Sequence, residues 1–171
     1  MAYDLLGRLV ARTDFEGKTT TYEYDHMDRV VQTEDGVGTV SVAYSADGQL
    51  STVTDGLGHT WTYAYDTALR LTSITDPVSK YVKYFYNSYG QLTKVGAGSS
   101  GTFDPTEYEY SATTGLMTKV KYWTGANHYD ANYAYDGLAR VTTLTDWIST
   151  GMSPASDGLR YGYDAGGRLT S

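Results

Sequence analysis

The chain contains no cysteine, only three prolines and three phenylalanines, and fewer cationic than anionic side chains. The absence of cysteine excludes a disulfide scaffold, a cysteine-ligated zinc site and a thiol nucleophile. The formal net charge of -7 at pH 7 argues against a nucleic-acid partner, since such a partner requires a basic surface. No apolar run approaches the length of about 20 residues that spans a bilayer, and no signal-peptide pattern opens the sequence.

Tyrosine, by contrast, is abundant, and it marks an internal repeat. The motif Tyr-Asp-x-x-Gly-Arg-Leu runs from Tyr3 to Leu9 and returns from Tyr163 to Leu169. The leading tyrosines of the eight copies, spaced by 20 to 28 residues, are Tyr3, Tyr24, Tyr44, Tyr65, Tyr86, Tyr110, Tyr135 and Tyr163. A second tyrosine precedes six of them by two positions, so the repeat accounts for 14 of the 18 tyrosines.

Each copy is predicted to form a β-hairpin. Segments such as 20–24 and 60–65 alternate bulky residues with small or polar ones, which is the period of a half-buried strand. A short tip and a second strand follow, and another turn leads to the next copy. We therefore predict an all-β fold, an antiparallel β-hairpin repeat ribbon of about eight hairpins that pair edge to edge.

The two kinds of turn differ in how much their length varies. Six positions separate the leading Tyr from the following Leu or Val in every copy, which predicts a tip of constant length. The other turn grows to residues 96–104, 123–128 and 147–157, and we expect these insertions to be loops.

Aspartate and arginine are gained and lost together in the tips. Five copies carry both residues, four positions apart: Asp4 and Arg8, Asp25 and Arg29, Asp66 and Arg70, Asp136 and Arg140, and Asp164 and Arg168. Three copies carry neither: Ser45 and Gln49, Asn87 and Gln91, and Ser111 and Gly115. We expect an ion pair or a charge-assisted hydrogen bond to close each charged tip. Gly7, Gly48, Gly90 and Gly167 fit a tip position with positive φ, which Thr114 occupies in one copy.

The paired tyrosines are predicted to share one face of the sheet and to stack against those of neighbouring copies. Apolar residues of the second strand, such as Leu50 and Val53, are three positions apart and break the alternation. Either a β-bulge or partial burial on both faces explains this spacing.

These motifs resemble the YD repeat of Rhs proteins, a family that includes polymorphic toxins, insecticidal toxin complexes and teneurins. The stretch from Leu50 to Asp66 is the best match, and the resemblance extends over essentially the whole chain. It implies a curved or spiralling β-sheet that forms part of a shell and encloses or displays a toxin or partner domain. The resemblance also implies a secreted, cell-surface or exported protein. Carbohydrate binding is attributed to some repeats of this family.

The chain is expected to be a single repeat array, residues 1–171, that begins and ends within a repeat and is a fragment of a larger protein. The Asp-Pro-x-Gly-Leu signature of a complete Rhs core is absent, so no self-cleavage residues are assigned. The expected partners are the rest of the parent chain or its toxin cargo, a glycan, or a second copy bound at the open sheet edges.

No catalytic motif is recognisable, and we expect no enzyme, no cofactor and no metal site. His26, His59 and His128 lack a partner motif. Five aspartates that recur between copies suit Asx-turns at strand ends better than a cation site: Asp14, Asp35, Asp55, Asp76 and Asp146.

Trp123 and Trp147 lie in or beside the enlarged turns, outside the repeat pattern. They are the candidate contacts for a ligand or partner, although they equally suit the anchoring of a long loop. Three functions remain open: a shell segment of an Rhs-type protein, a glycan-binding module, and a small β-propeller with two copies per blade. A propeller would show systematic differences between odd and even copies, and these hardly differ. The shell segment is preferred, with the glycan-binding module as the alternative.

Overall fold

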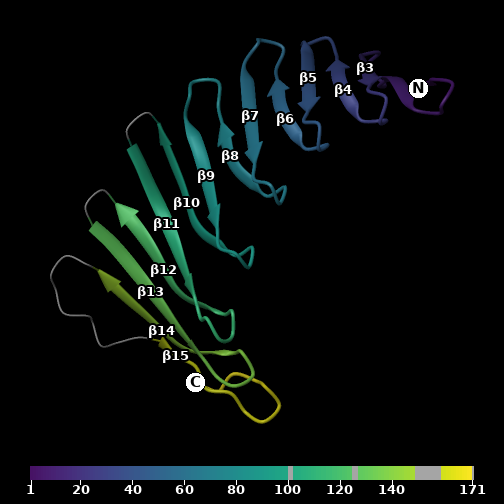
Figure 1. Ribbon diagram of the computed structural model, residues 1–171. Coiled ribbons are helices and arrows are strands. Elements are labelled where there is room, and N and C mark those ends of the chain that lie inside the picture. Colours follow the sequence, from purple (N-terminus) through teal and green to yellow (C-terminus); the bar gives the residue numbers. More distant parts are fainter. Residues whose placement is uncertain (100–101, 125–126, 149–158, 171) are drawn as a thin grey trace. The chain divides into compact units, whose positions relative to one another are not determined.

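A computed structural model describes residues 1–99, 102–124, 127–148 and 159–170. Within these residues the chain forms fifteen antiparallel strands and no helix, and the strands follow one another in the sheet in chain order (Figure 1). The prediction of an all-β hairpin ribbon is confirmed. The chain divides into two compact units, Met1–Tyr81 and Val82–Ser171.

The first unit contains short strands of regular length. They are β1 (Ala2–Tyr3), β2 (Leu9–Thr13), β3 (Thr19–Tyr24), β4 (Val30–Glu34), β5 (Thr39–Tyr44), β6 (Leu50–Thr54), β7 (Thr60–Tyr65) and β8 (Leu71–Thr75). In β3 every second side chain is half-buried and the intervening ones are exposed, as the alternating sequence predicts. Strand β4 pairs with β5 as well as with β3, so the four-stranded blades of a propeller do not form here.

A β-bulge or register shift at the start of the second strand, described in six hairpins, explains the broken alternation. Tyr44 pairs with Leu50, whereas Ala43 pairs with Thr52, so Ser51 is an extra residue. Beyond the bulge Val53 pairs with Val42. The bulge therefore brings Leu50 and Val53, three positions apart, onto the face that carries the tyrosines.

The second unit contains seven strands. They are β9 (Tyr81–Tyr86, whose first residue belongs to the first unit), β10 (Leu92–Ser99), β11 (Thr102–Tyr110), β12 (Met117–Thr124), β13 (Asn127–Tyr135), β14 (Val141–Ile148) and β15 (Leu159–Arg160). Strands β10 to β14, with eight or nine residues each, are longer than any in the first unit. The last tip is closed by an isolated bridge between Tyr163 and Leu169.

The expectation that the enlarged turns are loops is wrong for most of the inserted residues. Gly96 pairs with Pro105 and Trp123 pairs with His128, so the insertions lengthen strands β10 to β13. Asp146, expected in a turn, pairs with Ala131 inside β14. Pairing satisfies the backbone N–H and C=O groups of the inserted residues, which a loop of the same length would leave to water. Residues 149–158, the remainder of the last insertion, lie outside the described residues.

The expectation of a constant tip length is also wrong in one copy. The N–H of Ser111 donates to the carbonyl of Leu116, five positions on, whereas the N–H of Asp4 donates to Arg8, four positions on. Gly115 takes the left-handed conformation, with φ 71°, and Tyr110 pairs with Met117. The expected residue, Thr114, is β-branched and is strained at positive φ, so one added residue puts a glycine there.

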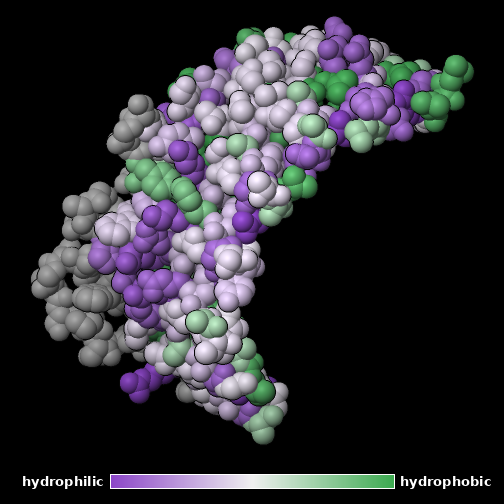
Figure 2. All heavy atoms as spheres, viewed as in Figure 1, coloured by the Kyte–Doolittle hydropathy of each residue, from purple (hydrophilic) through white to green (hydrophobic). Residues whose placement is uncertain are grey.

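The sheet has very little buried core. Val120, 3% exposed, is the only buried hydrophobic residue in the described parts of the chain. On the face drawn in Figure 2, hydrophobic residues lie in separate patches among polar ones. Each unit is therefore a thin sheet whose stability depends on contacts between neighbouring strands.

Candidate functional site

The hairpin tips carry the most regular side-chain geometry in the molecule. In the first tip, one carboxylate oxygen of Asp4 accepts the backbone N–H groups of Leu6 and Arg8, both at 2.9 Å. The other oxygen accepts Nε of Arg8 at 2.6 Å. A single aspartate thus closes the turn and binds the arginine. The longer side chain of glutamate would not place its oxygens at these positions.

All five charged tips bring the aspartate and the arginine into contact. The closest ion-pair distances are 2.6 Å for Asp4 and Arg8, 2.6 Å for Asp25 and Arg29, 2.6 Å for Asp66 and Arg70, 2.7 Å for Asp136 and Arg140, and 2.8 Å for Asp164 and Arg168. These contacts keep the aspartates ionised. Hydrogen bonding from the Arg29 guanidinium is the largest cause that lowers the pKa of Asp25, to about 2.

The pKa values of the other four tip aspartates are lowered as well. For Asp66 the largest cause is the hydrogen bond from the guanidinium of Arg70. For Asp4, Asp136 and Asp164 it is the hydrogen bond from the backbone N–H of the arginine in the same tip. Partial desolvation opposes the shift in every tip.

One uncharged tip keeps the same backbone hydrogen bonds and joins the same two side-chain positions with the donor and acceptor reversed. Oδ1 of Asn87 accepts the N–H groups of Tyr89 and Gln91, both at 3.0 Å. Nδ2 of Asn87 donates to Oε1 of Gln91 at 2.8 Å. The joint loss of Asp and Arg in this copy therefore removes the charge and preserves the shape of the tip.

The tip side chains also reach the following copy. Nη1 of Arg29 donates to the carbonyl of Gly48 at 3.3 Å, and its guanidinium lies 4.0 Å from the ring centroid of Tyr44. In the neutral tip, Nε2 of Gln91 donates to the carbonyl of Gly115 at 2.7 Å. Gly48 and Gly115 both have positive φ, so the contact is made to the same tip position in each case.

Three charged tips share this contact with the next leading tyrosine. The guanidinium of Arg8 lies 4.8 Å from the ring centroid of Tyr24, and that of Arg140 lies 4.4 Å from the ring of Tyr163. Arg8 also binds Asp28 at 2.7 Å. The sequence pattern predicts a contact within each tip and gives no sign of this second contact between tips.

The leading tyrosines join the copies through their hydroxyl groups. The hydroxyl of Tyr44 donates to the carbonyl of Val30 at 3.0 Å, and that of Tyr135 to the carbonyl of Met117 at 2.6 Å. The same bond links Tyr24 to Leu9, Tyr110 to Leu92 and Tyr163 to Val141. Sequence reasoning missed this role, although the excess of Tyr over Phe at these positions was its signal.

The two candidate tryptophans lie in strands. Trp123 belongs to β12, and Trp147, in β14, pairs through its backbone with Asp130. The Trp123 ring packs against His128 with centroids 4.8 Å apart, and its Nε1 is buried. The side chain of Trp147 lies outside the described part of the structure. A ligand cannot reach the Trp123 indole N–H in this arrangement.

The recurring aspartates of the other rim serve the turns. Oδ1 of Asp55 accepts the N–H groups of Leu57 and His59, both at 2.9 Å, and Asp14 and Asp76 do the same in their turns. Nδ1 of His59 lies 2.9 Å from Oδ2 of Asp55. No group of three or more His, Cys, Asp or Glu side chains able to hold a metal occurs in the described ranges. No helix among these residues is long and apolar enough to cross a membrane.

Comparison with known proteins agrees with this repeat geometry. A family model described as RHS Repeat matches residues 3–40, 44–80 and 65–102, more than half of the chain. The chain belongs to the Rhs repeat family. No curated protein matches this Rhs repeat chain.

Solved structures share the fold of this Rhs repeat chain at low sequence identity. The crystal structure of TcdB2-TccC3-Cdc42 is similar, with 15% identity, a TM-score of 0.73, and coverage of 96% of this chain and 10% of that one. The structures of TcdB2-TccC3-TEV and TcdB2-TccC3 match with TM-scores of 0.70 and 0.71, each at 15% identity and each covering 95% of this chain. The chain spans about a tenth of the length of these structures.

Proposed function

We propose that the chain is a non-catalytic structural segment of a larger Rhs protein, in which its hairpins form part of a β-shell that encloses or displays a toxin or partner domain. Such a protein would be secreted, displayed at a cell surface or exported as an effector. The partner is then the remainder of the parent chain.

The observation that carries this proposal is the continuity of contacts from copy to copy. Each leading tyrosine with a described hydroxyl bond donates it to the preceding copy, and tip side chains such as Arg29 and Gln91 reach the following one. A thin sheet with almost no buried core gains stability mainly through such neighbour contacts, as in other repeat proteins. Family membership and the similarity to short parts of much longer chains support the same role.

Electron microscopy of the natural full-length gene product tests the proposal. We expect a hollow β-shell whose wall includes these hairpins, with additional density inside it or attached to it. Limited proteolysis of the same protein should leave the enclosed or attached part protected until the wall is denatured. A compact full-length protein without a hollow wall would contradict the proposal.

A glycan-binding module is the second candidate, and one observation favours it. Tyr122 and Tyr129 pair directly across β12 and β13, and they are 49% and 44% exposed. Exposed aromatic rings of this kind offer an apolar surface with polar hydroxyl groups, which suits the faces of sugar rings. Trp123, a candidate contact in its own right, points to the opposite face of the same strand.

A glycan array with the 171-residue chain tests this second candidate. We expect binding that is lost in the Tyr122→Ala/Tyr129→Ala variant and retained in Tyr89→Ala, since Tyr89 is a tip tyrosine outside the platform and is even more exposed. Absence of binding across a broad panel would remove the candidate.

A further inference from the structure

One rim of the first unit exposes a row of apolar side chains. Each of its four turns, residues 14–18, 35–38, 55–59 and 76–80, carries one apolar side chain at its outer end. They are Phe15, Val37, Leu57 and Val78, with exposed fractions of 97%, 97%, 83% and 71%. A single exposed apolar side chain is ordinary, but turns favour polar residues and glycine, and here each of four successive turns also carries an exposed apolar side chain. We name these four residues the turn row.

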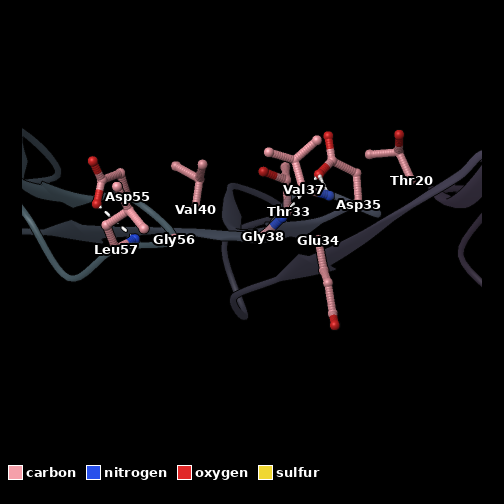
Figure 3. A pocket seen from close by; sticks show the side chains of 10 residues that line it. All are labelled: Thr20, Thr33, Glu34, Asp35, Val37, Gly38, Val40, Asp55, Gly56 and Leu57. Atoms are coloured by element: carbon pink, nitrogen blue, oxygen red, sulfur yellow. Dashed lines mark hydrogen bonds between the residues drawn. The ribbon is translucent and has the colours of Figure 1, made fainter.

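A groove of about 390 Å³ lies between the second and third of these turns. Its lining includes Val37, Leu57, Val40 and Thr33. Figure 3 shows Val37, Val40 and Asp35 on one side of the ribbon and Glu34 on the other. The next copy has the much larger Trp61 at the position of Val40, so the small side chain leaves this space open.

Two glycines bring these two turns into close contact. A Cβ added to Gly56 would lie 3.1 Å from the Cα of Gly38 and 3.1 Å from the backbone nitrogen of Thr39. The turns thus touch through their backbones at Gly38 and Gly56, which both line the groove. The spacing of Val37 and Leu57 is fixed by this contact rather than by a flexible loop.

The first unit also carries most of the negative charge. Residues 1–81 contain twelve Asp or Glu and six Lys or Arg, a net charge of -6 out of the total of -7. Three of the six cations, Arg8, Arg29 and Arg70, are paired with aspartates in the tips, on the opposite rim. Asp35 and Asp55 both line the groove, so its apolar walls stand in an acidic surrounding.

We propose that the turn row binds a polypeptide segment whose apolar side chains are flanked by lysine or arginine. Successive turns are two strands apart, about 10 Å. Three residues of a chain in the polyproline II conformation span nearly the same distance, at about 3.1 Å each, and this conformation places every third side chain on one face. A polyproline II segment with an apolar side chain at every third position therefore matches the row, and its intervening cations complement the acidic rim. One apolar side chain enters the groove between Val37 and Leu57. This proposal does not depend on whether the sheet belongs to a shell.

A fluorescein-labelled peptide of four Leu-Lys-Lys units, titrated against the 171-residue chain by fluorescence anisotropy in low salt, tests the proposal. We expect saturable binding that weakens with added salt. The Val37→Ser/Leu57→Ser variant should weaken it at least fivefold. Both side chains are exposed, so folding should be unchanged, which circular dichroism would verify. Leu138→Ser, a change at an exposed tip residue of the second unit, is the matched control and should leave the affinity unchanged.

Two control peptides separate the contributions of charge and apolar contact. A Ser-Lys-Lys peptide should bind at least fivefold more weakly than Leu-Lys-Lys, and a Leu-Glu-Glu peptide should not bind. Equal binding of Leu-Lys-Lys by the wild type and the Val37→Ser/Leu57→Ser variant would overturn the proposal, as would equal binding of the serine peptide. If the wild type self-associates in sedimentation experiments and the variant does not, the row binds a second copy. If the wild type binds phosphatidylcholine vesicles and the variant does not, the row binds a lipid surface. Either result would also overturn the proposal.

Discussion

The hydroxyl of Tyr24 donates a 2.8 Å hydrogen bond to the carbonyl oxygen of Leu9, fifteen residues earlier in the chain. The backbone pairing of β2 with β3 begins at Ala11 and Thr21, so Leu9 lies just beyond the last paired position. Val30 has the same place relative to β5, where pairing begins at Gln32, and its carbonyl accepts the hydroxyl of Tyr44. The tyrosine thus continues the hydrogen bonding between copies past the end of the backbone ladder.

Replacing Tyr24 by Phe should therefore weaken the junction between the first two copies. The substitution keeps the aromatic ring and removes the hydroxyl group, which donates to the Leu9 carbonyl. We expect the free energy of unfolding to fall by about 0.5–1.5 kcal/mol, the usual net value of one hydrogen bond. Urea denaturation of the 171-residue chain measures it.

Tyr22→Phe is the control for this prediction. Tyr22 lies two positions earlier on the same face of β3 and makes no hydroxyl hydrogen bond in the described structure. Its replacement should change the stability much less than that of Tyr24. Equal losses in the two variants would show that the hydroxyl bond to Leu9 contributes nothing specific.

Acid should loosen the charged tips. The pKa of Asp25 is lowered to about 2, and the pKa values of Asp4, Asp66, Asp136 and Asp164 are lowered as well. A carboxylate whose pKa is lower in the folded chain stabilises that chain above its unfolded pKa, near 4. The stabilisation is lost as the pH falls through the folded value. We therefore expect the free energy of unfolding to decrease between about pH 4 and pH 2, as measured by urea titrations across this range.

The neutral tip supplies a matched variant for the acid experiment. Asp25→Asn/Arg29→Gln copies the Asn87 and Gln91 pair, which keeps the backbone hydrogen bonds and joins the two side chains without charge. This double variant should lose stability less steeply with acid than the wild type does, while Asp25→Ala should lose stability already at neutral pH. Identical pH profiles for the wild type and the double variant would assign the acid response to other groups.

The pattern of the sequence predicts the repeat, the hairpins and the tip pairs because each depends on residues that are close together in the chain. Asp4 and Arg8 belong to one tip, and their joint presence or absence among the copies is visible as a pattern. The Tyr24–Leu9 bond and the contact of Arg29 with Gly48 join different copies through backbone carbonyl groups. Every residue type has this group, so the sequence does not show which residue accepts the bond. Such contacts leave only an indirect trace, here the preference for Tyr over Phe.

The lengths of the elements were less predictable than their order. Whether an insertion becomes a loop or a longer strand depends on the pairing available to its backbone, and Gly96 and Pro105 give no hint that they are cross-strand partners. The longer tip at Ser111 likewise follows from the backbone conformation of Gly115. Counting positions from Tyr110 to Leu116 gives the same number as in other copies and cannot reveal the change.

Gly56→Ala should separate the two turns that form the groove. The new Cβ would meet backbone atoms of Gly38 and Thr39 at 3.1 Å, and backbone atoms cannot move away as a flexible side chain would. We expect a loss of about 1–3 kcal/mol in the free energy of unfolding, typical of an overpacked contact. Gly36→Ala, in the first of these turns, meets nothing within 4 Å and is the control. A stability of Gly56→Ala equal to that of Gly36→Ala would contradict the close contact.

The left-handed tip position should make glycine substitutions unequal within the tips. Gly48 has φ 83°, a conformation that costs an ordinary L residue about 1 kcal/mol or more. Gly137 lies in another tip without positive φ and with no atom near its added Cβ. Gly48→Ala should therefore destabilise the chain by about 1 kcal/mol, while Gly137→Ala should be neutral or slightly stabilising because it restricts the unfolded chain. Leu69 and Ala139 occupy the left-handed position at φ 61° and 62°, so the reverse changes Leu69→Gly and Ala139→Gly should relieve strain. Urea denaturation of the four variants measures these changes. A lower stability of Gly137→Ala than of Gly48→Ala would contradict the assignment of strain to the left-handed tip position.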